Sequence, residues 1–254
     1  MKLNGNTVLI IGGSAGIGKE IAIAFHELGN KVIITGRSKD RLNEVVNRYP
    51  NIIAISNDMT SDEETNSLIA QIEKEFPQLK IVINNAAIAH YYSVAKDGRV
   101  AYDKAFEEIN TNYLSIIRLT GKILPLLKRQ DEAAIVNVSS IAAMVPSPLV
   151  GYSASKAALH SYTQSLRYEL SKEFPSIKVF ELQPSLVNTD ATKSMGWDNG
   201  ISPDKVAKAL IDGMEKDTYE IRVGYAEELY KIFLSSPESA LTTLRSLREK
   251  KTTI

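Results

Sequence analysis

Short apolar runs alternate along the chain with longer segments in which apolar residues recur every three or four positions. The short runs are rich in Val and Ile and predict strands over Thr7–Ile11, Lys31–Thr35, Ile52–Ser56, Ile81–Asn84, Ala134–Val138, Ile177–Gln183 and Glu220–Val223. The longer segments predict helices over Gly16–Leu28, Asp40–Tyr49, Asp62–Phe76, Tyr102–Lys128, Gly151–Phe174 and Pro203–Lys216. Apolar strands separated by helices are typical of a parallel sheet covered on both faces. We therefore expect an α/β fold, a single doubly wound (Rossmann) domain over residues 1–254 with about seven parallel strands.

Two polar segments interrupt this alternation, His90–Arg99 after the fourth strand and Ser185–Gly200 after the sixth. In a parallel sheet both emerge at the carboxyl ends of strands, where open α/β folds bind ligands. We expect these segments, at about 90–99 and 185–200, to form the rim of a substrate pocket. The rim would draw on His90, Tyr91, Tyr92, Met144, Val145, Pro148, Met195 and Trp197. An apolar, aromatic lining favours a lipophilic or medium-sized substrate.

Composition excludes several classes of protein. The charges balance, with 30 Lys and Arg against 30 Asp and Glu, so the net charge predicts binding to neither nucleic acid nor an anionic membrane. The chain has no Cys, which excludes disulfides and fits a reducing cytoplasm. No apolar run approaches the roughly 20 residues that a membrane helix needs. The three His lack metal-ligand spacing, so we expect a cytoplasmic protein without a metal site.

A glycine-rich turn, Gly12-Gly13-Ser14-Ala15-Gly16-Ile17-Gly18, joins the first predicted strand to the first helix. Glycines let the backbone approach a pyrophosphate closely, and a helix N-terminus offers free N–H groups and a partial positive charge. The spacing differs from the Gly-x-Gly-x-x-Gly of the standard dinucleotide fingerprint. It resembles the turn of the short-chain dehydrogenase/reductase family, with Ile11 where that family usually has Thr.

The end of the second predicted strand bears on the choice of cofactor. A carboxylate there would accept a hydrogen bond from the ribose of NAD and repel the 2′-phosphate of NADP. This chain has Gly36 where NAD-using relatives carry Asp, and Arg37 follows with a guanidinium suited to phosphate. The sequence therefore favours NADP(H) over NAD(H).

Further segments extend the resemblance over almost the whole chain. Asp58 matches the aspartate that contacts adenine, and Asn84-Asn85-Ala86-Ala87 resembles the family's Asn-Asn-Ala-Gly. Pro184–Thr189 resembles Pro-Gly-x-Val-x-Thr, with Ser185 in place of glycine. The resemblance implies cofactor contacts at Gly12, Ser14, Gly16, Ile17, Gly18, Arg37, Asp58, Met59, Asn85, Ala86, Lys156, Pro184, Val187 and Thr189. Within the family, the segments 159–168 and 219–224 are similar to the DltE-like bacterial oxidoreductases, which implies a bacterial source.

Reduction of a carbonyl needs a proton donor, and a tyrosine can serve when a lysine one helical turn away favours its ionised form. The pattern Tyr-x-x-x-Lys occurs at Tyr92/Lys96, Tyr152/Lys156 and Tyr168/Lys172. Family members also carry a serine at the end of the preceding strand, about 12 or 13 residues before the tyrosine. Only the pair Tyr152/Lys156 opens a helix behind a strand that ends in serines, Ser139 and Ser140. The sequence thus selects Tyr152 and Lys156 as the acid–base pair.

The serine itself has two candidates. The family's Ser-Ser motif places the functional residue second, at Ser140, whereas counting 13 residues back from Tyr152 gives Ser139. A loop shortened by one residue would reconcile the two, and we favour Ser140. The resemblance adds Asn112, which in relatives holds a water that links the lysine to solvent; a structural helix kink is the alternative. The predicted catalytic set is Asn112, Ser140, Tyr152 and Lys156.

The resemblance implies an NADP(H)-dependent oxidoreductase that transfers hydride between the cofactor and a small-molecule carbonyl or alcohol. An NADP(H)-binding regulatory protein with little catalysis is the alternative, although it would not need the complete Ser, Tyr, Lys and Asn set. A second alternative is a membrane-surface protein that uses the amphipathic tail at Ala226–Leu234 and Leu241–Leu247, but those residues fit a core or subunit contact better. Relatives commonly pair through the two long helices predicted above, so we expect a homodimer or homotetramer.

Overall fold

Seven parallel strands form one sheet in the computed structural model, which describes residues 1–249. The strands are β1 (Thr7–Ile11), β2 (Lys31–Gly36), β3 (Ile53–Ser56), β4 (Leu79–Asn84), β5 (Ala133–Val138), β6 (Ile177–Pro184) and β7 (Glu220–Val223). Their order in the sheet is β3-β2-β1-β4-β5-β6-β7. The chain therefore has the predicted doubly wound α/β fold, with the strand order reversing between β1 and β4. Residues 250–254 of the expected domain lie outside the described part of the chain.

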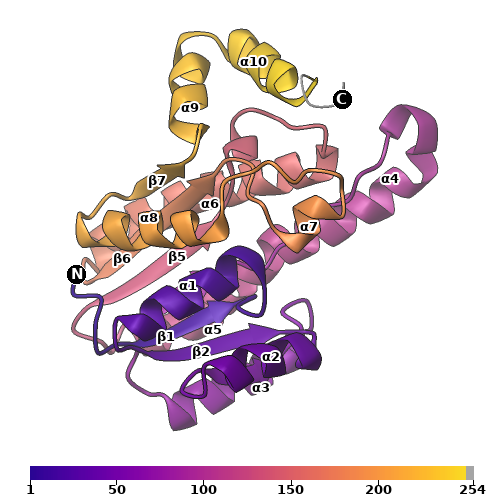
Figure 1. Cartoon of the computed structure of the whole chain (residues 1–254). Helices are drawn as coiled ribbons and strands as arrows, with labels where there is room; N and C mark the ends of the chain where they lie inside the picture. The colour runs from indigo at the N-terminus through magenta and orange to yellow at the C-terminus, as the bar shows by residue number, and fades with distance from the viewer. Residues whose placement is uncertain (250–254) are drawn as a thin grey trace.

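Helices cover both faces of the sheet (Figure 1). They are α1 (Gly16–Glu27), α2 (Lys39–Arg48), α3 (Asp62–Glu75), α4 (Val94–Ile109), α5 (Ser115–Leu127), α6 (Val150–Glu173), α7 (Asp190–Lys193), α8 (Pro203–Glu215), α9 (Ala226–Ser235) and α10 (Pro237–Glu249), with a π-helical segment at Asn110–Leu114 and a 3-10 turn at Ile141–Ala143. Apolar residues of α1, α2 and α8 pack on one face, and those of α3, α5 and α6 pack on the other.

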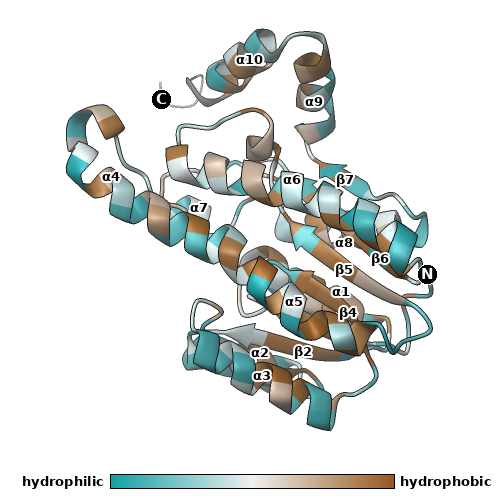
Figure 2. Cartoon of the chain, turned by 180° about the vertical axis from the view of Figure 1, so that it is seen from behind, coloured by the Kyte–Doolittle hydropathy of each residue, from teal (hydrophilic) through white to brown (hydrophobic). Residues whose placement is uncertain are grey.

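Burial of the sheet on both faces explains why its strands are apolar almost throughout. Every residue of β1 is buried, and the central strands are coloured as hydrophobic over most of their length in Figure 2. Alternate residues of β6 serve the two cores, because Phe180 and Leu182 join one cluster while Ile177 and Val179 join the other. Glu181 and Gln183 continue the alternation of Ile177 and Val179 along β6, but they are polar and fully buried.

The helix predicted over Tyr102–Lys128 is present, but it begins eight residues earlier and is interrupted by a π segment. Helix α4 begins at Val94, inside the segment expected to be a rim loop, because Ser93 accepts a hydrogen bond from the Lys96 N–H at 3.3 Å and caps it. The helical path then widens to π geometry at Asn110–Leu114 before α5 begins. The Ser115 hydroxyl donates to the carbonyl of Asn110 at 2.7 Å, which supports the wider turn. π segments of this kind occur frequently at functional sites.

The C-terminal helices form a small third core above the sheet (Figure 1). Leu229 of α9 and Leu244 of α10 pack with Ile141 and Val145, which follow β5. Ala226, Leu229 and Leu244 of the tail are thereby buried against the domain, whereas Leu234 and Leu247 are exposed. Among the residues described, no helix has both the length and the apolar character needed to cross a membrane.

Candidate active site

A cleft of about 740 Å³ lies at the carboxyl ends of the strands, where the strand order reverses. Its walls come from the turns after β1, β2, β3, β4, β5 and β6 and from the start of α6. All the residues predicted to bind cofactor line it except Gly18, and so do Ser140, Tyr152 and Lys156. The structure thus brings together in one cleft predicted site residues that are distant in the sequence, from Gly12 to Thr189.

The turn after β1 is held open by its glycines. Gly12 and Gly16 have φ angles of 80° and 53°, which favour glycine, and the N–H groups of Gly12 and Gly13 both donate to the carbonyl of Thr35 at 3.0 Å. A Cβ at Gly18 would lie 2.1 Å from the Gly12 carbonyl oxygen, so the helix can approach the turn only with glycine there. Gly18 lies behind the cleft and packs the turn rather than lining it.

The N-terminus of α1 presents its free N–H groups to the cleft. Ala15 precedes the helix and offers no side-chain cap, and the first turn carries no acidic residue. Arg37 and Arg41 line the same part of the cleft, and neither guanidinium forms an ion pair with the residues described. Unsatisfied N–H groups and two cations on one side of a cleft fit a phosphate-bearing ligand.

The turns after β3 and β4 complete this half of the cleft. The Asp58 carboxylate accepts hydrogen bonds from the N–H and the hydroxyl of Thr60, at 2.9 and 2.7 Å, and Met59 lies beside it. The Asn85 side chain donates to the Gly12 carbonyl at 2.7 Å, and the Ala86 N–H donates to Ile11 at 2.8 Å. Asn85 and Ala86 therefore fasten the glycine turn to β4.

The segment after β6 keeps an unstrained backbone despite its serine. Ser185 stands where relatives carry glycine, but it is not among the described residues with a left-handed φ. Its buried Oγ has no hydrogen-bond partner in the structure and points toward Gly224, where a Cβ would lie 2.2 Å from it, while the residue itself forms part of the cleft wall. Val187 and Thr189 follow on the same wall, and Thr189 forms a capping box with Thr192 at the start of α7.

Lys156 is almost completely buried beside Tyr152, with 1% of its surface exposed. Its Nζ donates to the Val138 carbonyl at 2.8 Å and lies 5.6 Å from the centre of the Tyr152 ring. Burial lowers the pKa of Lys156 to about 8, although the charge of Glu181 opposes that shift. Both side chains face the cleft because Tyr152 and Lys156 lie one turn apart on α6.

The two serines after β5 have different partners. The Ser139 hydroxyl donates to the buried carboxylate of Glu181. Ser140 Oγ accepts from the Ala142 N–H at 3.1 Å and has only a long contact, 3.5 Å, with the Pro184 carbonyl as donor. The Ser140 proton is therefore the more available of the two for a ligand in the cleft.

Asn112 is fully buried in the π segment and does not line the cleft. Its Oδ1 accepts from the Ile88 N–H at 2.8 Å, while its Nδ2 donates to the Ile88 carbonyl at 2.8 Å and to Ser155 Oγ at 2.9 Å. Asn112 thereby ties the segment after β4, which lines the cleft, to α6 next to Lys156.

The expected pocket rim is correct in part. His90, Met195 and Trp197 line the cleft, and so does most of the segment after β6. Tyr91 instead points into solvent, 73% exposed, because α4 starts three residues later and carries this segment away from the cleft. The remaining expected rim residues do not line the cleft, because they pack with the C-terminal helices or α6 or lie at the surface: Tyr92, Met144, Val145 and Pro148.

The other two Tyr-x-x-x-Lys pairs stay out of the cleft. Tyr168 is 64% exposed and pairs with Lys172 on the surface of α6. Tyr92 lies next to Gly151, near Glu108, and does not reach the cleft. Only the pair at Tyr152 lines the cleft, as the sequence predicts. Residues 1–249 contain no group of three or more His, Asp and Glu that could hold a metal ion.

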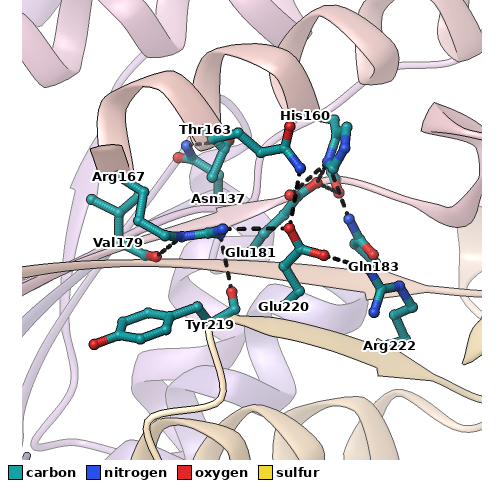
Figure 3. A network of polar contacts seen from close by, with 12 residues as sticks. Asn137, His160, Thr163, Arg167, Val179, Glu181, Gln183, Tyr219, Glu220 and Arg222 are labelled. Carbon is teal, nitrogen blue, oxygen red and sulfur yellow. Dashed lines mark hydrogen bonds and ion pairs between the residues drawn. The ribbon is translucent and has the colours of Figure 1, made fainter. Parts of the chain in front are cut away.

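A buried polar network behind Lys156 was not predicted from the sequence (Figure 3). It joins Glu181 to Ser139 and to His160, which stands one turn after Lys156 on α6. The one sequence signal was an acidic residue between two apolar ones, Phe180 and Leu182, in the strand segment 177–182, IKVFEL.

Comparison with known proteins agrees with this architecture. A family model described as short chain dehydrogenase matches residues 6–199. The uncharacterized oxidoreductase DltE of Bacillus subtilis is 37% identical over 227 residues, which span 87% of this chain and 89% of that protein. An uncharacterized oxidoreductase of Staphylococcus saprophyticus is 29% identical over 227 residues, 86% of this chain and 95% of that protein.

A solved structure shows how closely the fold is shared. A short chain dehydrogenase from Burkholderia cenocepacia, crystallised in complex with NADP, superposes with a TM-score of 0.83 at 24% identity and covers 96% of this chain and 99% of its own. The resemblance found in the sequence is confirmed by the family match and the DltE relative. The chain belongs to the short chain dehydrogenase family of oxidoreductases.

Proposed function

We propose that this protein is an NADP(H)-dependent oxidoreductase acting on a small-molecule carbonyl or alcohol. The observation that carries the proposal is the meeting of Tyr152, Lys156 and Ser140 in the same cleft as the glycine turn. Family membership supports the reaction class, and the solved relative in complex with NADP supports the cofactor class. A panel of ketones and aldehydes, followed by NADPH absorbance with NADH in parallel, tests both parts.

The side chains of the cleft divide the proton chemistry between them. Tyr152 gives its hydroxyl proton to the substrate oxygen in reduction and takes a proton back in oxidation. Ser140 donates a hydrogen bond to the same oxygen and stabilises the charge that develops there. The Lys156 ammonium stabilises the tyrosinate, and Asn112 holds the Ile88 backbone in place beside α6. The nicotinamide cofactor, when bound, supplies hydride for reduction or accepts it in oxidation.

The cofactor would lie along the carboxyl edge of β1, β2 and β4. The free N–H groups of α1 would receive its pyrophosphate, and Asp58 and Met59 would flank its adenine. Arg37 supports NADP(H) over NAD(H), because its exposed guanidinium lines the cleft beside Gly36. Pro184, Val187 and Thr189 would bound the nicotinamide end, where Lys156 stands.

The substrate half of the cleft favours an apolar carbonyl compound of medium size. Its lining contains few charged groups and is contributed by Ile141, Leu149, Leu186, Met195, Trp197, Tyr225 and Leu244. Apolar walls gain affinity from the area that a ligand removes from water. Within a series of alkyl ketones, we therefore expect kcat/KM to rise with chain length until the cleft is filled.

Ser140→Ala should lower kcat/KM about 10²-fold, because loss of one donor to a developing oxyanion costs roughly 10²–10³. Ser139→Ala is the matched control, with the same change one residue earlier. Its hydroxyl is engaged by Glu181, so we expect a loss at least tenfold smaller than that of Ser140→Ala. Steady-state kinetics with one ketone measure both losses. A larger loss in Ser139→Ala than in Ser140→Ala would assign the hydrogen bond to the substrate oxygen to Ser139.

A cofactor-binding regulator on the same fold is the alternative function. It would bind NADPH with high affinity and leave the nucleotide unoxidised with every carbonyl offered. The orientation of Ser140, Tyr152 and Lys156 into one cleft favours catalysis. Binding by fluorescence titration together with turnover separates the two functions.

We expect a homodimer or homotetramer that uses α4, α5 and α6. Several apolar side chains of this surface are exposed in the single chain, among them Tyr102 at 75%, Phe106 at 57% and Val150 at 50%. Phe106→Glu should shift the protein to the monomer, since it places a charge in the expected contact without touching the core. Light scattering after size-exclusion chromatography measures the change, and a wild-type monomer would refute the expected assembly.

A further inference from the structure

Glu181 is a carboxylate with no exposed surface, on a strand whose other residues are mostly apolar. Burial of a charge is costly unless partners replace the lost water. Glu181 has two such partners: the Ser139 hydroxyl donates to Oε1, and His160 Nδ1 lies 2.8 Å from Oε2 and 3.0 Å from Oε1. An apolar side chain would fill this site at a lower cost in desolvation free energy. The presence of a carboxylate therefore indicates a role other than packing.

The carboxylate adjoins the elements that hold the reacting groups. In the sheet, Glu181 pairs with Asn137, the residue before Val138, whose carbonyl accepts from Lys156 Nζ at 2.8 Å. Lys156 and His160 lie on one face of α6 at i and i+4. One face of α6 therefore makes both contacts. Lys156 binds β5, and His160 binds Glu181, as Figure 3 shows for the histidine.

We propose that Glu181 is a positioning residue of the active site: its buried carboxylate provides the counter-charge for the Lys156 ammonium and engages the Ser139 hydroxyl, which leaves Ser140 to the substrate. This inference rests on the proposed oxidoreductase function. It deepens that function by assigning a role to a residue behind the catalytic groups, with no contact to substrate or cofactor.

The charges around Lys156 support this role. Burial alone disfavours the ammonium, and the Glu181 charge is the counteracting influence on its pKa. Without Glu181, the ammonium would lose its proton at lower pH, and with it the tyrosinate would lose its stabilising charge. The charge of Lys156, and with it the stabilisation of the Tyr152 tyrosinate, would then be lost at a pH closer to neutral.

His160 couples this carboxylate to the protein surface. Its hydrogen bond to Glu181 raises the pKa of His160, in competition with burial. Glu220 of β7 raises that pKa further and Arg222 of β7 lowers it, while Arg167 of α6 pairs with Glu220 at 3.4 Å. When His160 is charged it neutralises Glu181, and when it is neutral the carboxylate acts on Lys156 alone.

The test compares Glu181→Gln with Glu220→Gln, which makes the same change on the far side of His160. Lysine Cε signals followed by NMR across pH report the Lys156 midpoint without any turnover, and Lys156→Arg identifies the signal. In the wild type we expect a midpoint near 8, well below the roughly 10.4 of ordinary lysines. Glu181→Gln should lower it by about one pH unit, whereas Glu220→Gln should leave it in place.

Reductase activity gives a second readout. The alkaline limb of the pH–rate profile should move to lower pH by the same amount in Glu181→Gln and should not move in Glu220→Gln. An unchanged Lys156 midpoint in Glu181→Gln, or an equal shift in Glu220→Gln, would overturn the proposal. A protein that shifts its lysine midpoint as expected but reduces no carbonyl would refute the oxidoreductase function and leave the charge pairing intact.

His160→Gln decides the matter if Glu181→Gln fails to fold. It keeps the carboxylate and removes its cationic partner, so the Lys156 midpoint should stay or rise. A fall would show that disturbance of the network, rather than loss of the carboxylate charge, lowers the midpoint. That result would equally overturn the role assigned to Glu181.

Discussion

Tyr152→Phe is expected to lower kcat about 10³-fold, which is the largest effect that we predict for a single residue. The change removes one hydroxyl oxygen and keeps the ring in the cleft beside Lys156. General acid catalysis by a positioned side chain contributes roughly 10²–10⁴, and among the tyrosines that line the cleft in the described part of the chain only Tyr152 has a lysine one helical turn away. The dissociation constant for NADPH should change less than threefold, as measured by fluorescence titration.

Tyr168→Phe is the matched control for this experiment. It makes the identical change in a second Tyr-x-x-x-Lys pair of the same helix, on a side chain that is 64% exposed. We expect activity within a factor of two of the wild type. Substantial activity in Tyr152→Phe, or a comparable loss in Tyr168→Phe, would contradict the assignment of the proton donor.

Gly36→Asp is expected to reverse the choice of cofactor. The new carboxylate would stand beside Arg37, repel a 2′-phosphate and accept a hydrogen bond from the ribose of NAD. Like charges brought together in an interface cost several kcal/mol, and each 1.4 kcal/mol is tenfold. The ratio of kcat/KM for NADPH over NADH should therefore fall about 10³-fold, as measured with one ketone and both nucleotides.

Steric effects at Gly36 are small and can be separated from charge. An added Cβ would lie 3.0 Å from the Ser14 hydroxyl oxygen, a group that can rotate away, and 3.5 Å from Ser14 Cβ. Gly36→Asn has nearly the same shape as Gly36→Asp without the charge, so we expect it to keep NADPH as the better cofactor. If both variants lost the preference for NADPH equally, the size of the new side chain would be the cause. That result would contradict selection by charge at this position.

The sheet was predictable because each strand is determined by residues that are adjacent in the sequence. Each buried strand appears in the sequence as an apolar run, and all seven begin and end within two residues of the predicted bounds. The glycine turn was predictable for the same reason, since Gly12, Gly16 and Gly18 fall within seven consecutive residues. Tyr152 and Lys156 could be selected from two nearby features, the strand that ends in serines before them and the helix in which they lie.

The features that were missed depend on contacts between distant residues. The π segment interrupts a strongly helical pattern because Asn112 binds the backbone of Ile88, 24 positions away. The bonds of Glu181 reach Ser139 and His160 at separations of 42 and 21 residues. Such pairs leave no periodic pattern in a single sequence, so an acidic residue between Phe180 and Leu182 was the available sign.

The third core above the sheet places part of the cleft wall outside the segment that matches the family model. The family match ends at residue 199, after the glycine turn and Tyr152, whereas Tyr225 and Leu244 lie beyond it and still line the cleft. Leu244 packs in one cluster with Ile141, one residue after Ser140, so the last helices wall the cleft next to that serine. Substitutions in α9 and α10 can consequently reshape what the cleft admits while the hydrogen bonds of Lys156 and Asn112 stay as they are. Selectivity in this protein can evolve separately from its chemistry.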